Sequence, residues 1–222
     1  MINTIYIYIT RFTRALSDEI FKEYLALLPI VLQKKNSRFV RWQDRHSHLF
    51  GKLLLVEGLK QFGYDINSLS HLLYNKYDRP FLNENIDFNI SHSDEFVICA
   101  IGQKVRIGID IERIKEIDFS HFSRVMTNEQ WDTINNSINP KQTFFNFWVI
   151  KESVIKANSR GLSIPLLDLY VNSNNTVNFD KMTWYLKELL IDKDYCSFLS
   201  SNIPIQNIKI IEIDYFENRK WL

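Results

Sequence analysis

The spacing of apolar residues changes several times along the chain, and each change marks an expected element. Ile and Tyr alternate with each other within residues 4–9, which predicts a strand. Ser17 is a suitable N-cap for a helix that ends at Pro29. Apolar residues then recur at helical spacing, which predicts two further helices over residues 31–43 and 46–62.

Shorter apolar runs follow in the middle of the chain. Residues 86–91, 96–101 and 105–112 are separated by polar breaks, which is typical of an antiparallel meander. Thr127 and Gln130 then fit a capping box at the start of a short helix.

A long helix is expected next, from Asn139-Pro140 to about Asn158, because proline is favoured at the first helical position. Beyond Gly161 the pattern returns to short strands, and Asn172-Ser173-Asn174-Asn175 predicts a hairpin turn. The expected strands are residues 169–171, 177–179, 183–191, 194–199 and 207–216.

Helices followed by strands, twice over, predict an α+β fold built from two halves. We place the N-terminal half at residues 1–109 and the C-terminal half at residues 110–222. No glycine-rich linker separates them, so we expect the halves to pack tightly.

Composition narrows the possible functions. The 222 residues carry 27 Lys and Arg against 26 Asp and Glu, and this net charge of +1 argues against a general nucleic-acid binder. No apolar run approaches the roughly 20 residues of a membrane span, and the N-terminus lacks the basic lead of a signal peptide. Two cysteines, Cys99 and Cys196, make no disulfide framework. A cytoplasmic protein is expected.

A pair of carboxylates lies on the predicted strand that ends the middle region. Side chains alternate across a strand, so Asp110 and Glu112 share one face, about 6–7 Å apart. Their repulsion of roughly 2–3 kcal/mol needs relief from solvent, a basic side chain or a cation. An acidic face in water is the simple interpretation. Mg²⁺ is the alternative, and Gly108 allows a backbone or ligand to approach closely.

The long helix carries a second charged pair. Glu152 and Lys156 are four residues apart and share one face, so they fit a surface ion pair. The residues around them are mostly apolar, which indicates a largely buried helix whose charges lie at a cleft. Glu152 is therefore also a candidate third carboxylate for a metal, with Lys156 beside it to neutralise a phosphate.

Two further segments suggest anion binding. Ser91 and His92 end a strand, where their side chains and the backbone N–H groups of the turn suit an anion, although this motif alone favours a plain polar turn. Basic residues gather between positions 34 and 45. Four of them follow a single helical stripe, either a solvated face or a phosphate-holding one: Lys34, Arg38, Arg41 and Arg45.

Together these motifs resemble the 4'-phosphopantetheinyl transferases, in the larger, monomeric class that activates non-ribosomal peptide and polyketide synthases. Three segments carry the resemblance, in the family's order: residues 88–93, residues 108–112, and residues 148–156 followed by Gly161-Leu162. The resemblance implies two halves related by a pseudo-twofold axis, each a small antiparallel sheet packed with helices. It also implies that coenzyme A binds in the cleft between them.

The resemblance assigns roles residue by residue. Asp110, Glu112 and Glu152 match the family's magnesium carboxylates, with Mn²⁺ as a possible substitute, and Lys156 matches its catalytic lysine. The residues expected at coenzyme A are Lys35, Arg45, Arg79, Ser91, His92 and Lys156.

Three positions depart from the family's usual pattern. Val149 stands where Ser or Thr is common, and Ser159 replaces the first Gly of a Gly-x-Gly-Leu run. His48 stands where a smaller residue is usual. None of the three removes an expected metal ligand.

The expected reaction moves the phosphopantetheine arm of coenzyme A to a serine of an acyl or peptidyl carrier protein and releases 3',5'-ADP. The carrier is expected to dock near Phe119, Phe122, Arg124 and Met126, although a core-facing segment explains these residues equally well. Two alternatives remain: a Mg²⁺-dependent phosphohydrolase or nuclease that uses the same carboxylates, and a degenerate scaffold that binds coenzyme A or a carrier. The intact carboxylates and Lys156 argue against the scaffold.

Overall fold

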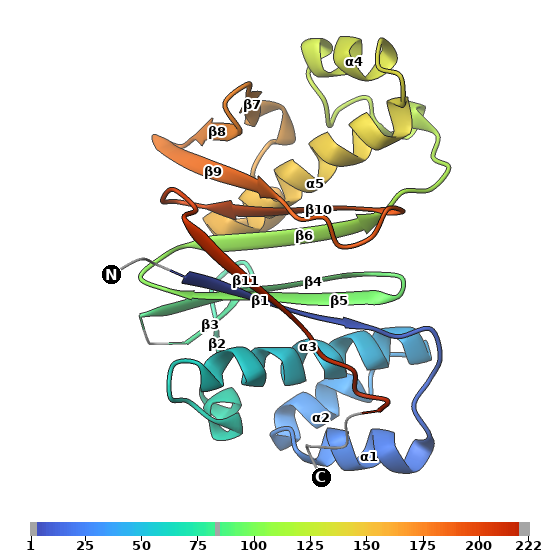
Figure 1. Ribbon diagram of the computed structural model, residues 1–222, viewed down its shortest axis with the longest axis vertical. Helices are drawn as coiled ribbons and strands as arrows, with labels where there is room; N and C mark the ends of the chain where they lie inside the picture. The colour runs from blue at the N-terminus through green and yellow to red at the C-terminus, as the bar shows by residue number, and fades with distance from the viewer. Residues whose placement is uncertain (1–3, 83–84, 218–222) are drawn as a thin grey trace.

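The computed structural model describes residues 4–82 and 85–217 as an α+β fold in four layers (Figure 1). Helices cover the outer face of each of two sheets, and the inner faces of the sheets pack against each other. The first sheet has the order β11-β1-β5-β4 and the second has the order β6-β10-β9-β8-β7. Strands β2 and β3 pair with each other as a separate two-stranded ribbon.

The strands have the following bounds: β1 Thr4–Arg11, β2 Leu73–Tyr74, β3 Pro80–Phe81, β4 Ile86–Ser93, β5 Phe96–Gln103, β6 Ile107–Arg113, β7 Tyr170–Asn172, β8 Thr176–Phe179, β9 Met182–Glu188, β10 Tyr195–Ser201 and β11 Asn207–Glu212. The α-helices are α1 Asp18–Ala26, α2 Ile30–Asn36, α3 Trp42–Lys60, α4 Asn128–Asn135 and α5 Pro140–Asn158. Four short 3₁₀ helices are η1 Ile66–His71, η2 Phe119–Phe122, η3 Gly161–Ser163 and η4 Leu166–Asp168.

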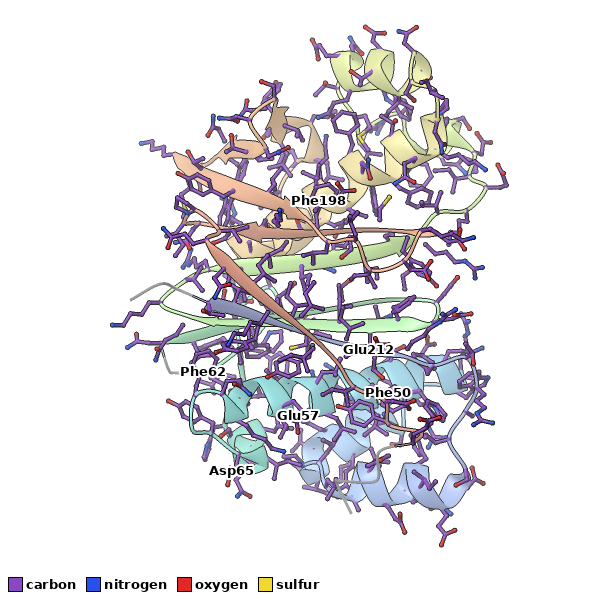
Figure 2. All side chains as sticks on the ribbon, viewed as in Figure 1. Phe50, Glu57, Phe62, Asp65, Phe198 and Glu212 are labelled. Atoms are coloured by element: carbon purple, nitrogen blue, oxygen red, sulfur yellow. The ribbon has the colours of Figure 1, made fainter. Side chains whose placement is uncertain are left out.

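Three apolar cores hold these layers together. The core below the first sheet packs it on α1, α2 and α3 and includes Phe50, and the core above the second sheet packs it on α5 and includes Phe198 (Figure 2). The third core lies between the sheets and is rich in isoleucine. Strand β5 reads as a continuous apolar run because both of its faces are covered: Cys99 faces α3, and Ile98 faces the second sheet.

Local sequence signals are confirmed at several element ends. Ser17 caps α1, Thr127 and Gln130 form both bonds of a capping box at α4, and Pro140 begins α5. The predicted hairpin forms between β7 and β8. In the described residues, no helix has the length and apolar character to cross a membrane.

The predicted meander is only partly correct. Strands β4 and β5 pair antiparallel, but β6 leaves this sheet and pairs with β10 instead. The reason is that Ile107, Ile109 and Ile111 are needed in the core between the sheets, where each is fully buried. The last strand, β11, crosses in the other direction and pairs with β1 in parallel. The domain boundary between residues 109 and 110 stays a prediction. Strand β6 of the second sheet spans this boundary, and β11 from the C-terminal half belongs to the first sheet.

Candidate functional site

Side chains of β4 join the two sheets by bonding to the backbone along the unpaired edge of β6, which is the edge strand of its sheet. Asp87, Asn89 and Ser93 each accept a hydrogen bond from a backbone N–H of β6, at distances of 2.8, 2.9 and 3.1 Å. The donors are Ile107, Ile109 and Arg113. These bonds satisfy backbone N–H groups at the edge of β6 that would otherwise need a neighbouring strand as their partner. We call this line of contact between β4 and β6 the seam.

Asp110 lies within the seam and receives two of its hydrogen bonds. Ser91 donates to Asp110 Oδ1 at 2.8 Å, and Lys156 Nζ donates to the same oxygen at 2.6 Å. Lys156 also donates to Ser91 Oγ at 3.0 Å. The carboxylate is 3% exposed, so the expected acidic face in water is wrong for this residue. Three elements, β4, β6 and α5, therefore converge on one carboxylate.

Gly108 explains how α5 comes so close to β6. A Cβ atom at this position would lie 2.0 Å from Ser153 O and 2.5 Å from Ala157 N, so only glycine fits. The predicted close approach is thus made by the backbone of α5. Ser200 Oγ strengthens the contact by donating to Ser153 O at 2.8 Å. This packing brings the helix face with Glu152 and Lys156 against Asp110.

The other two carboxylates feel the charge of Asp110. Burial, followed by the charge of the nearby Asp110, raises the pKa of Glu152, Lys156 opposes the shift, and the net value is about 7. Burial and Asp110 likewise raise the pKa of Glu112, which accepts a 2.9 Å hydrogen bond from Ser93 Oγ. Lys156, expected to pair with Glu152 on one helix face, instead forms its ion pair with Asp110, while its charge still opposes the rise in the pKa of Glu152.

The three acidic side chains suit a hard divalent cation in their chemistry. Asp110 Oδ2 is buried and has no hydrogen-bond partner among the described residues. Burial, and after it the charge of Asp110, raises the pKa values of Glu112 and Glu152 beside it. Within residues 4–82 and 85–217, no group of three or more His, Cys, Asp or Glu side chains is arranged so that it could hold a metal ion as it stands. Lys156 is the cation at Asp110 in this arrangement.

His92 is exposed beside the seam. Desolvation of the ring by neighbouring protein atoms lowers its pKa, and the charge of Lys156 acts in the same direction, whereas Asp44 and Asp110 oppose the shift. It lines a pocket of about 280 Å³ together with Asp44, Ser47 and Arg41 from the start of α3. Ser91 and His92 thus point to different partners, Ser91 to Asp110 and His92 to this pocket.

The predicted basic stripe is wrong as a single helical face. Helix α2 ends at Asn36 and α3 begins at Trp42, so the residues between them break the spacing. Arg45 packs its guanidinium 4.8 Å from the ring centroid of Phe21, and its Nε is buried without a described partner. Lys35 is exposed, with Nζ 5.3 Å from the ring centroid of Tyr74.

Lys52 is a basic residue that the sequence interpretation missed. Burial, with a smaller contribution from the charge of Lys35, lowers its pKa to about 8. Burial also lowers the pKa of His48 to about 4, with Lys52 and then Lys35 adding to the shift. The available signal was the spacing, because Lys52 follows His48 by one helical turn. Lys35 and Lys52 therefore bring two basic groups together between α2 and α3, and His48 beside them is neutral near pH 7.

Arg79 is bound by the protein itself. Its Nη2 donates to both carboxylate oxygens of Asp87 at 3.0 Å, to Ile107 O at 2.9 Å and to Phe88 O at 3.3 Å. Its Nη1 donates to Ser159 Oγ. The side chain is 13% exposed. The structure therefore places Arg79 at the end of the seam that carries Asp87, and does not bring it to Asp110.

The segment expected to dock a carrier is mostly part of the upper core. Met126 is 2% exposed, and Phe119 and Phe122 pack edge-to-face or tilted on Phe144, with centroids 5.2 and 5.1 Å away. The core-facing interpretation is thus correct for these apolar residues, because the aromatic side chains of α5 need cover. Arg124 alone of the proposed docking residues is exposed.

Lys151, next to Glu152, was not singled out from the sequence. Its side chain is buried, and Nζ donates to Val125 O at 2.7 Å and to Leu166 O at 2.8 Å. Burial lowers its pKa to about 8. A lysine inside an apolar helix face was the only sequence signal. It ties the segment after η2 to η4 across α5.

Comparison with known proteins gives the family. Residues 106–203 match the model of the 4'-phosphopantetheinyl transferase superfamily. The chain is 34% identical to 4'-phosphopantetheinyl transferase gsp of Aneurinibacillus migulanus over 199 residues, covering 82% of this chain and 84% of the relative. It is 32% identical to 4'-phosphopantetheinyl transferase Sfp of Bacillus subtilis (strain 168) over 158 residues, covering 69% of this chain and 70% of the relative.

A solved holo-[acyl-carrier-protein] synthase from Thermotoga maritima aligns with 43% of this chain and 61% of its own, at 11% identity and a TM-score of 0.34. That likeness is too low to carry an argument. The two long sequence matches are sufficient, because both relatives are covered over more than two thirds of their length. The chain belongs to the 4'-phosphopantetheinyl transferase family.

Proposed function

We propose that this enzyme transfers the 4'-phosphopantetheine arm of coenzyme A to a serine of an acyl or peptidyl carrier protein, with Mg²⁺, and releases 3',5'-ADP. The observation that carries the proposal is the convergence of Ser91, Asp110 and Lys156 at the seam, with Glu112 and Glu152 beside them. The serine Oγ forms a bond to the phosphorus next to pantetheine. The bond from that phosphorus to the bridging oxygen breaks.

Asp110, Glu112 and Glu152 are the proposed ligands of the metal, and Mn²⁺ is the expected substitute. The unpartnered Oδ2 of Asp110 and the two raised pKa values support this choice. A bound divalent ion supplies charge neutralisation at the diphosphate. Mg²⁺ binds preferentially to oxygen ligands, and these three carboxylates supply them.

Lys156 is proposed to stabilise the leaving phosphate. Its side chain is 28% exposed, so the ammonium group is accessible to a ligand at the seam while remaining close to Asp110. Transfer of a phosphoryl group depends mainly on positioning and on neutralising charge, and a lysine held by Ser91 and Asp110 provides both.

Glu152 is proposed to accept the proton of the attacking serine, directly or through a water. A pKa of about 7 places its basicity near neutral pH, where general-base catalysis is efficient. Metal binding lowers carboxylate basicity, so this second role competes with the first.

Coenzyme A is proposed to bind along the seam towards α2 and α3. Ser91 and His92 are the proposed phosphate contacts near the reacting centre, and Lys35 and Arg45 supply positive charge at the nucleotide end. Their exposed or partly exposed positions support this assignment for Lys35 and His92. Arg79 is the exception, because its guanidinium is already occupied by Asp87, Ser159 and backbone carbonyls.

The decisive experiment mixes the enzyme with an apo carrier protein, coenzyme A and Mg²⁺ and measures the carrier by mass spectrometry. The expected result is a gain equal to one phosphopantetheine arm, lost on chelation of the metal. Cleaved coenzyme A without a gain on the carrier supports a phosphohydrolase. Bound, intact coenzyme A supports a scaffold, and either outcome would contradict the proposal.

A further inference from the structure

The Asn75–Arg79 turn reaches across the molecule to the end of α5. Asn75 Oδ1 accepts from the backbone N–H groups of Tyr77 and Arg79, at 2.8 and 3.0 Å, which fixes the turn. Asn75 Nδ2 then donates to Ser159 O at 2.9 Å, and Arg79 donates to Ser159 Oγ. One residue, Ser159, is held through both its carbonyl and its hydroxyl.

Ser159 occupies a conformation that favours glycine. Its φ is +71° and its ψ is 11°, in the left-handed region just after the last turn of α5. A residue with a side chain costs about 1 kcal/mol or more in this region. The bonds from Asn75 and Arg79 offset that cost in the folded protein. The hydroxyl that Arg79 contacts is what distinguishes this chain from the glycine usual in the family.

Ser159 is coupled directly to the helix turn that carries Lys156. Its backbone N–H bonds to Ile155 O and to Lys156 O, each at 3.2 Å. On its other side, Arg79 is fixed by Asp87 and by Ile107 O, which belong to the two strands of the seam. The turn, the seam and the end of α5 therefore form one connected network.

We infer that Arg79 is a positioning residue, which, together with Asn75 and Ser159, sets the last turn of α5 so that Lys156 reaches Asp110. This inference rests on the proposed function of Lys156. It assigns no nucleotide contact to the guanidinium, since Nη1 and Nη2 already donate to protein acceptors and Nε is buried. We call the contacts of Asn75 and Arg79 with Ser159 the clamp. Loss of the clamp is expected to lower the rate of transfer and to leave the affinity for coenzyme A unchanged.

The test compares Ser159→Ala with Arg79→Lys. Ser159→Ala removes the hydroxyl and keeps the strained backbone, and we expect kcat to fall about 3- to 10-fold. The KM for coenzyme A stays within about 2-fold, because nothing that touches the nucleotide changes. Arg79→Lys loses the planar fork and lowers kcat in the same way. The double variant falls less than the product of the two single effects, because both remove the same contact.

Thr133→Ala is the matched control, since Thr133 carries an exposed hydroxyl on α4 that donates to Glu129 O of its own helix. It leaves kcat unchanged. A rise in the KM for coenzyme A in Arg79→Lys, with Ser159→Ala behaving as wild type, would overturn the inference in favour of a nucleotide contact. A lower melting temperature in Ser159→Ala with unchanged kcat would reduce the clamp to a structural role and overturn it as well.

Hydrogen exchange keeps this test separate from the proposed function. The amides of Ala157, Asn158 and Ser159 exchange faster in Ser159→Ala than in wild type, whatever reaction the enzyme catalyses. Absence of transfer in the wild type contradicts the proposed function alone. Unchanged exchange at these amides contradicts the clamp alone.

Discussion

Lys156 and Asp110 are joined by a 2.6 Å hydrogen bond between residues that are 46 positions apart in the sequence. The pair connects α5 to β6 at the point where Ser91 of β4 reaches the same carboxylate oxygen. Because Asp110 is 3% exposed, its negative charge has little solvent to stabilise it. Lys156 therefore stabilises the buried carboxylate of Asp110 when no substrate is bound, and it lies at the proposed reaction centre.

Asp110→Asn tests the proposed centre. The amide keeps the size of the carboxylate but removes its charge, so both the metal and Lys156 lose their partner. We expect transfer to a carrier to fall by about 100-fold or more. Asp132→Asn is the control, because Asp132 is exposed on α4. Equal rates in both variants would contradict the assigned role of Asp110.

Glu152 predicts a pH dependence of stability. Its pKa is raised from 4.5 to about 7, so the folded protein keeps a proton that the unfolded chain releases. The free energy of unfolding of the metal-free protein therefore falls as pH rises from 4.5 to 7, by up to about 3 kcal/mol. Urea titrations across this range measure the change. Glu152→Gln flattens the fall, whereas Glu23→Gln, an exposed control on α1, leaves it unchanged.

Addition of Mg²⁺ should act on the same pH range. A bound cation favours the ionised form of Glu152, so the fall in stability between pH 4.5 and 7 becomes smaller. The measurement is the same urea titration with Mg²⁺ and with chelator. Identical curves under the two conditions would contradict metal binding by this carboxylate.

Gly108→Ala tests the close approach of α5 to β6. The added Cβ would lie 2.0 Å from a backbone oxygen, so the strand and helix must separate, and we expect a loss of about 3 kcal/mol or more in stability. Gly63→Ala is the matched control. Gly63 has a φ of +82° but no atom within 4 Å of the new Cβ, so its cost of about 1 kcal/mol is conformational alone. Thermal melts compare the two variants.

Met126→Ala and Arg124→Glu separate core from surface in the expected docking segment. Met126 is buried, so its truncation should cost about 2–5 kcal/mol of stability. Arg124 is exposed, and reversal of its charge should raise the KM for an acidic carrier with little change in the melting temperature. An unchanged carrier KM in Arg124→Glu would move the docking surface elsewhere.

Local interactions were readable directly from the sequence. The cap at Ser17, the capping box of Thr127 and Gln130 and the start of α5 at Pro140 each involve residues within three positions of one another. The alternation in β6 likewise determined which side chains share a face with Asp110. The motifs around Asp110 and Lys156 also carried the family resemblance, because their residue types and order do not depend on knowing the fold.

Contacts between distant segments were decided only by the tertiary structure. The partner of Lys156 is Asp110 and not Glu152 one helical turn away, and Arg79 is occupied by Asp87 and Ser159. The basic stripe failed because α2 ends where its terminal turn packs against α3, which propensity over a short window does not report. In each case the contact depends on which surfaces are brought together when the apolar cores form. That arrangement is determined by the free energy of burying apolar surface over the whole chain. The sequence by itself specified the elements and the chemical groups, whereas packing determined which of those groups meet.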